Sequence, residues 1–259
     1  MKPDFLRLPE VPAKPRTVGV THMLDKGIPL NTTAAILRSY ADHMDFWKFG
    51  WGTAYVESQL ADKLAVLHEH DVVACLGGTL MEIAWAQNAV DECLAWARRV
   101  GFRAVEVSRG SVPMPLSAKA MIIRQAAPHF TVLAETGYKS AERLMSLDEW
   151  SAEIVEDLDS GAEYIVTEGR ESGTVGVYDH DGEPKPEVVR AVIEAAGLER
   201  ALFEAPRKSQ QAWFINEFGP DVNLGNIPPD DALALHTLRL GLRADTISIT
   251  TTTVESVRL

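Results

Sequence analysis

Cysteine is scarce in this sequence. Cys75 and Cys93 are the two cysteines among 259 residues, and both fall inside segments expected to form regular structure. Their spacing is not that of a metal site, and the zinc-binding pattern His-Glu-x-x-His is missing as well. We therefore expect two reduced thiols, with neither a disulfide nor a zinc centre.

Positive charge is also in short supply. Lysine and arginine number 25 against 37 aspartates and glutamates, which gives a formal net charge of -12. A surface of that sign repels nucleic acid and anionic membranes, so we expect neither as a partner. Apolar runs of membrane-spanning length are absent, and residues 1–16 lack the apolar core of a signal peptide. The sequence predicts a cytoplasmic protein in which any anion site is locally basic.

Two widespread enzyme signatures are missing. The first predicted strand is not followed by Gly-x-Gly-x-x-Gly, the turn that binds dinucleotides in doubly wound open sheets. The chain also has no Gly-x-Ser-x-Gly turn, which presents a nucleophilic serine in hydrolases. These absences disfavour the open-sheet alternative and covalent serine catalysis.

Short apolar, β-branched segments alternate with amphipathic segments of helix length along almost the whole chain. Eight such repeats in a chain of this size predict a single-domain (β/α)8 TIM barrel of the α/β class. The expected strands are residues 17–21, 45–49, 72–76, 104–108, 131–135, 164–168, 201–204 and 221–224. The expected helices are residues 31–42, 57–70, 87–100, 116–127, 147–160, 186–197, 208–217 and 229–241. We assign residues 1–16 to an N-terminal extension, 17–246 to the barrel and 247–259 to a C-terminal tail.

Two of the expected helices begin with typical capping residues. Asn31 stands at the start of the first helix, and Ser146 precedes two acidic residues at the start of the fifth. Side chains of these types accept hydrogen bonds from the first free backbone N–H groups of a helix. Both are predicted N-caps.

Acidic side chains stand at the carboxyl ends of four successive predicted strands. Glu106 and Ser108 share one face of the fourth strand, and the next three strands end at Glu135, Glu168 and Glu204. Catalytic groups of such barrels lie at these strand ends. A single carboxylate there is more often a helix cap or an ion-pair partner. Their repetition favours a cluster, which needs a cation such as Mg²⁺ to offset its repulsion.

Basic side chains lie close to these strand ends. Lys48 falls inside the second strand, where a buried unpaired ammonium group would be costly, so it should face the mouth or a carboxylate. A structural ion pair is the alternative role for this lysine. Arginine and lysine bind phosphate and carboxylate groups, so the set suits a phosphorylated acid. The other candidate cations are Lys26, Lys139, Arg170, Arg207 and Lys208.

Glycine-rich turns follow the second and third strands, at residues 50–53 and 77–79. Backbone N–H groups of Gly78 and Thr79 could approach an anion closely there, although tight turns alone also explain the glycines. Asn223 and Asn226 flank Gly225 near the eighth strand, where barrels often bind phosphate, but asparagine also suits left-handed turns. His22 and Asp25 are expected just after the first strand, with His22 a possible acid, ligand or lid residue.

Residues 16–246 resemble the phosphosulfolactate synthase family, which joins sulfite to phosphoenolpyruvate in coenzyme M biosynthesis and has bacterial and plant members. The resemblance rests on long strings in a fixed order. They are LDKG from Leu24, KFGWGT from Lys48, GGTLMEIA from Gly77, EVSRGS from Glu106, EGRESGTVG from Glu168, FEAPRKSQQAWFI from Phe203, and GPDVNLGNIPPDD from Gly219 with the LRLGLRADT that follows.

The resemblance implies a Mg²⁺-dependent (β/α)8 lyase that forms homo-oligomers and adds sulfite to C3 of phosphoenolpyruvate. It implies Lys139 as the group that protonates C2, with Lys48 in reserve, and Glu106, Glu135 and Glu168 in the metal region. The implied binding residues for phosphate, carboxylate and sulfite are Lys26, Arg170, Arg207 and Lys208, with Gly78, Thr79, Ser108 and Asn223 beside them.

The chain departs from the family pattern at four positions. Thr136 and Tyr138 lie beside the proposed acid, Arg109 stands where aspartate is common, and His236 replaces a usual glutamate. A changed substrate or nucleophile is therefore an open alternative, in the form of a related addition on another phosphorylated or enolisable carboxylate. A non-catalytic role like that of the plant heat-stress members is the other alternative. Mutually repelling charges at one mouth argue against it.

Overall fold

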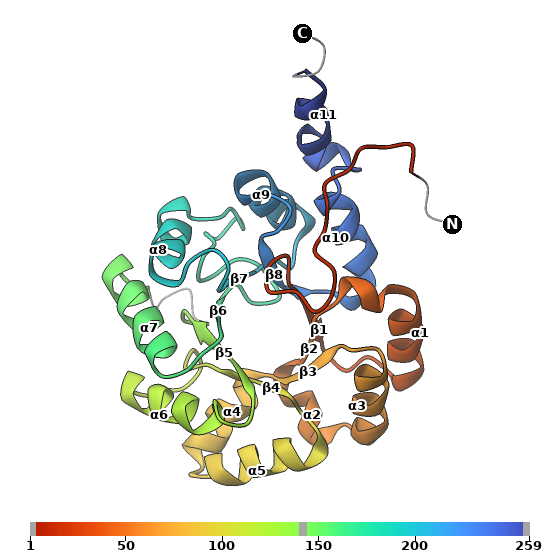
Figure 1. Cartoon of the computed structure of the whole chain (residues 1–259). Coiled ribbons are helices and arrows are strands. Elements are labelled where there is room, and N and C mark those ends of the chain that lie inside the picture. The colour runs from red at the N-terminus through yellow and green to blue at the C-terminus, as the bar shows by residue number, and fades with distance from the viewer. Residues whose placement is uncertain (1–3, 140–143, 256–259) are drawn as a thin grey trace.

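The computed structural model describes residues 4–139 and 144–255. Eight parallel strands close into a barrel in chain order, with the helices in a ring around it, as Figure 1 shows. The predicted single-domain (β/α)8 fold is confirmed. The strands are β1 (Thr21–Asp25), β2 (Phe46–Phe49), β3 (Val73–Leu76), β4 (Ala104–Val107), β5 (Thr131–Thr136), β6 (Tyr164–Thr167), β7 (Ala201–Glu204) and β8 (Asn223–Ile227).

The helices follow the strands in the alternation that the sequence predicts. The α7 helix begins with a capping box in which Ser146 and Glu149 satisfy each other's backbone N–H groups, so the Ser146 prediction is confirmed. The Asn31 prediction is wrong, because the first helix starts at Leu30 with Pro29 as its cap. The helices are α1 (Leu30–Tyr40), α2 (Thr53–Val56), α3 (Leu60–Glu69), α4 (Gly78–Ala86), α5 (Val90–Val100), α6 (Leu116–Ala126), α7 (Leu147–Asp159), α8 (Pro186–Ala196), α9 (Lys208–Phe218), α10 (Ala232–Arg239) and α11 (Ser248–Glu255).

The barrel interior has an apolar lower layer and a charged upper layer. Phe46, Leu133 and Leu202 belong to a buried apolar cluster inside the barrel. Side chains alternate across a strand, so the residues two positions further along β2, β5 and β7 point to the same side. Those residues are Lys48, Glu135 and Glu204. Because side chains alternate along each strand, these charged side chains form a layer directly above the apolar layer inside the barrel.

Strands β1 and β8 are displaced from their predicted positions. Gly19 adopts a left-handed φ of +70° and donates a hydrogen bond to the carbonyl of Asp221, and the predicted strand 17–21 is irregular backbone up to Val20. The strand runs over Thr21–Asp25 instead, and His22 and Asp25 lie within it. Strand β8 likewise begins at Asn223 and ends at Ile227. The expectation that His22 and Asp25 follow the first strand is wrong.

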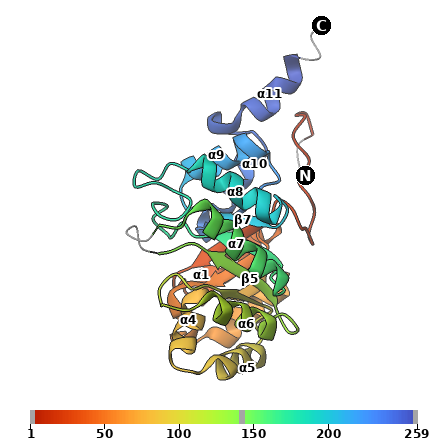
Figure 2. The ribbon, with the colours of Figure 1, turned by 90° about the vertical axis from the view of Figure 1, so that its left-hand side faces the viewer.

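Segments at both termini lie outside the barrel ring. The Arg16 guanidinium pairs with Asp45 at 2.9 Å, which fixes the N-terminal extension near the start of β2. The α11 helix, which the sequence did not predict, projects away from the barrel, as Figures 1 and 2 show. In the described ranges, 4–139 and 144–255, no helix has the length and apolarity that crossing a membrane requires. Both cysteines are free thiols.

Candidate functional site

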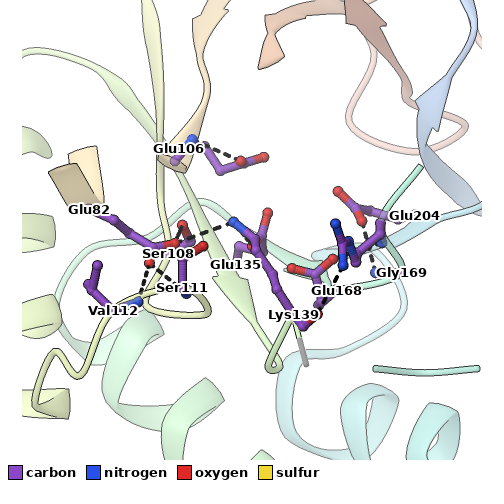
Figure 3. Close-up of polar contacts among 12 residues, drawn as sticks. Glu82, Glu106, Ser108, Ser111, Val112, Glu135, Lys139, Glu168, Gly169 and Glu204 are labelled. Atoms are coloured by element: carbon purple, nitrogen blue, oxygen red, sulfur yellow. Dashed lines mark hydrogen bonds and ion pairs between the residues drawn. The ribbon is translucent and has the colours of Figure 1, made fainter. Parts of the chain in front are cut away.

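A cavity of about 490 Å³ opens at the carboxyl ends of the strands. Its lining includes Lys48, Glu106, Glu135, Lys139, Glu168 and Glu204, which come from strands β2, β4, β5, β6 and β7 or their ends. Figure 3 shows the acidic side chains converging from neighbouring strands. The predicted gathering of charge at this mouth is present. We call the five glutamates Glu82, Glu106, Glu135, Glu168 and Glu204, together with Lys48 and Lys139, the mouth cluster.

Lys48 lies between two carboxylates inside the barrel. Its Nζ is 2.9 Å from Glu106 Oε2 and 3.0 Å from Glu204 Oε1, and all three side chains are buried. Burial alone would lower the pKa of Lys48, but these two carboxylates raise it well above its usual range. The expectation that this lysine meets a carboxylate agrees with its geometry.

Backbone N–H groups hold the other oxygens of the same two carboxylates. Gly78 N donates to Glu106 Oε1 at 3.0 Å, and Gly169 N donates to Glu204 Oε2 at 2.8 Å. A Cβ on Gly78 would lie 2.4 Å from Ser108 Oγ, so only glycine allows this approach. The predicted N–H donor of Gly78 therefore faces the protein's own carboxylate.

Lys139 reaches into the cavity from the loop after β5. Its Nζ is 3.2 Å from Glu135 Oε1 and 3.3 Å from Glu82 Oε1. Burial lowers the pKa of Lys139, but the surrounding carboxylates outweigh it and raise that pKa above its ordinary value. Burial would raise the pKa of Glu135, yet Lys139 and Lys48 lower it to about 2. At neutral pH these two residues form an ion pair.

Glu168 and Glu106 lie in the same acidic surroundings with less compensation. Burial and the carboxylates of Glu135 and Glu204 raise the pKa of Glu168 well above its usual range. Burial, opposed by Lys48, brings the pKa of Glu106 to about 7. Among the described residues, the buried Glu168 Oε2 has no hydrogen-bond partner. The cluster therefore holds protons that a cation could displace.

Glu82 is a member of the mouth cluster that the strand pattern of the sequence does not indicate. It lies on α4, which begins directly after β3 and was not predicted. Its carboxylate accepts hydrogen bonds from Ser108 Oγ, from Ser111 N at 2.7 Å and from Val112 N at 3.0 Å. Figure 3 shows these bonds, which fix the loop after β4. A lone glutamate within the apolar run LMEIAWA was the available signal.

Three glutamates have the geometry of a cation site. Glu106, Glu135 and Glu204 each offer an oxygen, and these oxygens lie within 4.8 Å of one another. All three are buried, and carboxylate oxygens are the ligands that Mg²⁺ prefers. The type and spacing of these oxygen ligands therefore fit a divalent cation. Glu168, which the family resemblance had placed in the metal region, adjoins this trio through Glu135.

Arg170 and Thr79 also line the cavity, as expected of substrate-binding residues. Arg170 adopts a left-handed φ of +55°, and its backbone N–H donates to Glu168 Oε1 at 2.7 Å. Its guanidinium is half-exposed and donates to the carbonyl of Lys139 at 3.3 Å. A cation is thereby available at the rim of the cavity.

Asn226 lines the cavity, whereas the predicted Asn223 does not. Asn226 Oδ1 is buried and lacks a hydrogen-bond partner within the described ranges. Asn223 lies at the opposite end of β8, where its Oδ1 accepts from Val20 N at 2.9 Å and its amide donates to Glu199 O at 3.0 Å. The two-residue error in the start of β8 caused this exchange of asparagines.

Three further predicted cations lie outside this cavity. Lys26 Nζ stands 5.4 Å from the ring centre of Trp51 and lines a neighbouring groove. Arg207 donates to Asp181 O at 3.0 Å, and Lys208 pairs with Asp245 at 2.9 Å on the surface. The three residues do follow strand ends as predicted, but their side chains contact loops and helices and do not line the cavity.

The side chains at the four positions that depart from the family pattern do not line the cavity either. Arg109 Nε donates to Glu153 Oε2 at 2.9 Å, and the guanidinium stands 5.4 Å from the ring centre of Tyr138. Neither Arg109 nor Tyr138 is among the residues that line the cavity. His236 of α10 stacks on His43, and the two ring centres are 3.9 Å apart. Thr136 Oγ1 donates to Asp157 at 3.4 Å, outside the barrel wall.

His22 and Asp25 take opposite sides of β1. His22 is fully buried, and within the described residues neither ring nitrogen has a hydrogen-bond partner. Burial and the charge of Lys48 lower the pKa of His22, so the ring is neutral. Asp25 accepts from the Trp47 indole and from Lys63 Nζ, both at 2.9 Å. Asp25 is thus part of the packing between the barrel and α3.

A family model described as (2R)-phospho-3-sulfolactate synthase matches residues 9–245. The chain belongs to the phosphosulfolactate synthase family. It is 42% identical to the phosphosulfolactate synthase of Bacillus subtilis, with 94% of this chain and 98% of that protein covered. It is 39% identical to the enzyme of the same name from Methanothermobacter thermautotrophicus, over 94% of this chain and 96% of the relative. The family assignment from the sequence motifs is confirmed.

More distant relatives and solved structures extend this result. Protein HEAT-STRESS-ASSOCIATED 32 of Arabidopsis thaliana is 25% identical, over 82% of this chain and 83% of the plant protein. A crystal structure of 3-hexulose-6-phosphate synthase superposes with a TM-score of 0.57 at 16% identity, covering 85% of this chain and 97% of that one. At such low identity, the superposition shows only that this phosphosulfolactate synthase family member and that enzyme share a fold.

Proposed function

We propose that this protein is a carbon-sulfur lyase that adds sulfite to phosphoenolpyruvate, with Mg²⁺, and forms 2-phospho-3-sulfolactate. The observation that carries the proposal is the mouth cluster, in which two lysines stand among five glutamates, four of which line one cavity. Family membership supports the same reaction. Such a charge pattern suits an anionic substrate that arrives together with a divalent cation.

Glu106, Glu135 and Glu204 would hold the magnesium ion, with Glu168 beside them. Bound there, the ion supplies positive charge for the substrate carboxylate as negative charge builds up on it. Gly78 N and Gly169 N fix two of these carboxylates in place through hydrogen bonds. The protein's contribution is therefore a pre-oriented set of ligands.

The reaction needs one bond to carbon and one proton. The sulfur of sulfite forms a bond to C3 of phosphoenolpyruvate, and the electrons of the C2–C3 double bond move toward C2 and the carboxylate. Lys139 then gives a proton to C2, while the phosphate ester stays intact. The raised pKa of Lys139 keeps this side chain protonated in the resting protein. Lys48 stays behind the carboxylates as a fixed positive charge.

Arg170 is our candidate for binding the phosphate group. It is the half-exposed guanidinium at the rim, and its position over the Lys139 carbonyl places it beside the proposed acid. Arginine binds phosphate through two parallel N–H bonds. Thr79 and Asn226 offer further polar contacts in the same cavity.

The unusual side chains beside Lys139 favour the family reaction over a changed substrate. Arg109 forms an ion pair with Glu153 and contacts Tyr138, so its charge is compensated behind the barrel wall. The cavity therefore does not acquire an extra guanidinium from this substitution. A cavity without this extra charge favours sulfite and phosphoenolpyruvate, the substrates of the family reaction, over a changed substrate.

Product analysis tests the proposal. Purified protein is incubated with phosphoenolpyruvate, sulfite and Mg²⁺, and the products are followed by phosphorus NMR and mass spectrometry. We expect a sulfonated phospho-acid that depends on both sulfite and Mg²⁺. Lys139→Ala should reduce the rate by about 10²- to 10⁴-fold, the typical contribution of a positioned acid. An absence of sulfonated product at saturating sulfite would rule out this reaction.

A further inference from the structure

A buried set of ion pairs lies behind β5, on the outer side of the barrel wall. Lys119 of α6 has no exposed side-chain surface, and its Nζ donates to Glu153 Oε1 at 2.8 Å and to Asp157 Oδ2 at 2.6 Å. The same Nζ also donates to the backbone carbonyl of Glu135 at 2.8 Å. A group outside the barrel is therefore bonded directly to the strand position that carries Glu135.

Arg109 joins this set from the loop after β4. Its Nε donates to Glu153 Oε2 at 2.9 Å, and a second nitrogen, Nη2, donates to the same oxygen. Its remaining terminal nitrogen donates to the Tyr138 hydroxyl at 3.3 Å, and the guanidinium stands 5.4 Å from the centre of the Tyr138 ring. Arg109, Lys119, Glu153 and Asp157, with Tyr138, form what we call the outer network.

Tyr138 directly precedes Lys139, and the loops after β4 and β5 meet at this point. Lys139 N donates to Gly110 O at 3.5 Å, and Gly110 directly follows Arg109. A Cβ on Gly110 would lie 3.0 Å from Lys139 Cγ, and one on Gly137 would lie 2.6 Å from Glu168 Cβ. The two loops thus leave little free space around the backbone and stem of Lys139.

We propose that Arg109 is a positioning residue which, through Tyr138 and Glu153, holds the loop that carries Lys139 over the mouth cluster. It does not line the cavity, so it acts through the placement of Lys139 and not through substrate contact. The inference rests on the proposed function in one respect, because it takes Lys139 as the proton donor. A displacement of about 1 Å at such a group can cost up to about 10²-fold in rate.

The chain supplies a matched control for a test. Arg124 also connects α6 to α7, where its guanidinium contacts Glu156 at 3.4 Å and donates to Ser160 Oγ at 2.8 Å. That pair is exposed and lies away from the loops after β4 and β5. Arg124→Met therefore removes another arginine that contacts α7, without disturbing the outer network.

The experiment compares Arg109→Met, Arg109→Lys and Arg124→Met with the unmodified protein. Methionine keeps much of the volume of arginine, and Glu153 retains its bond to Lys119, so Arg109→Met should fold. We expect kcat to fall by about 10-fold or more in Arg109→Met while KM for phosphoenolpyruvate changes by less than about twofold. Arg109→Lys, which keeps a charge for Glu153, should recover part of kcat. Arg124→Met should retain full kcat.

Hydrogen exchange of the backbone amides gives a readout that needs no turnover. Peptides that span Thr136 to Lys139 should exchange faster in Arg109→Met than in the unmodified protein, and at the unmodified rate in Arg124→Met. Unchanged exchange in Arg109→Met, or an unchanged kcat, would overturn the positioning role. If the unmodified protein forms no sulfonated product, the proposed function fails, and the exchange data alone still decide the positioning role.

Discussion

The mouth cluster and the outer network place ionised groups on opposite sides of the same strand, β5, yet their charge balance differs. The mouth cluster has five glutamates and two lysines. The outer network pairs Arg109 and Lys119 with Glu153 and Asp157. Inside the barrel, acid exceeds base, whereas outside it the charges cancel.

This difference in charge balance distinguishes the mouth cluster, a candidate binding site, from the outer network, which supports the barrel wall. Balanced, hydrogen-bonded pairs can tolerate burial because each charge has a partner. An acidic excess is tolerated only when some carboxyl groups keep their protons, and the raised pKa values of Glu106, Glu168 and Glu204 show that condition. A bound divalent cation would relieve an excess of this kind.

Removal of the central cation of the outer network should have the largest effect on stability. In Lys119→Met, Asp157 keeps no cationic partner in the network and a buried carboxylate is left uncompensated. Breaking such a pair typically costs about 3–5 kcal/mol in the free energy of unfolding. Urea denaturation measures this loss. The double variant Lys119→Met with Asp157→Asn should recover part of it, and a loss below about 1 kcal/mol would contradict a structural role for the network.

Neutralisation of one acid in the mouth cluster should increase the stability of the fold, whereas Lys119→Met should decrease it. The pKa of Glu168 is raised in the fold, so above about pH 4.5 the unfolded chain ionises this group while the folded protein keeps its proton. Its contribution to stability therefore falls as pH rises through that window. Without metal, Glu168→Gln should gain about 1 kcal/mol or about 2–4 °C in Tm near pH 8, and less near pH 5.

A Glu168→Gln variant that is less stable than the unmodified protein at both pH values would contradict the acidic excess. Melting curves with EDTA present separate this effect from metal binding. Glu153→Gln, in the outer network, serves as the matched substitution, because Lys119 and Arg109 outweigh burial and lower the pKa of Glu153.

The surface lysine outside both regions should matter least. Lys208 was a predicted substrate-binding residue, but it is half-exposed and pairs with Asp245 away from the cavity. Exposed pairs contribute little, so Lys208→Ala should change kcat/KM and Tm only slightly, with less than about a twofold change in activity. A tenfold rise in KM for phosphoenolpyruvate would instead return this residue to the site.

Much of the barrel and of the mouth cluster could be predicted from the sequence. Strand periodicity located six of the eight strands to within one residue at each end, and the charged positions of β4 to β7 followed from them. Glu106, Glu135 and Glu168 therefore emerged from the pattern itself. Lys48 did too, because a lysine inside an apolar strand needs a carboxylate.

The remaining features depended on local geometry that the sequence pattern does not encode. The left-handed conformation of Gly19 makes β1 begin later in the chain than predicted. Strand β8 also begins later than predicted, and Asn226 lines the cavity in place of Asn223. Glu82 was missed because α4 starts immediately after β3. The direction of a long side chain is also not fixed by its position near a strand end, as Arg109 and Lys208 show.

Magnesium binding to the substrate-free protein is the most direct test of the central claim that the acidic excess of the mouth cluster is a divalent-cation site. Calorimetric titration should show one ion bound per chain, with proton release and with affinity that increases as pH rises through about 7, because Glu106 must lose its proton. Glu135→Gln should abolish binding, and Asp157→Asn should leave it unchanged. No binding, or binding that persists in Glu135→Gln but is lost in Asp179→Asn at the exposed Asp179–His180–Asp181 group, would contradict it.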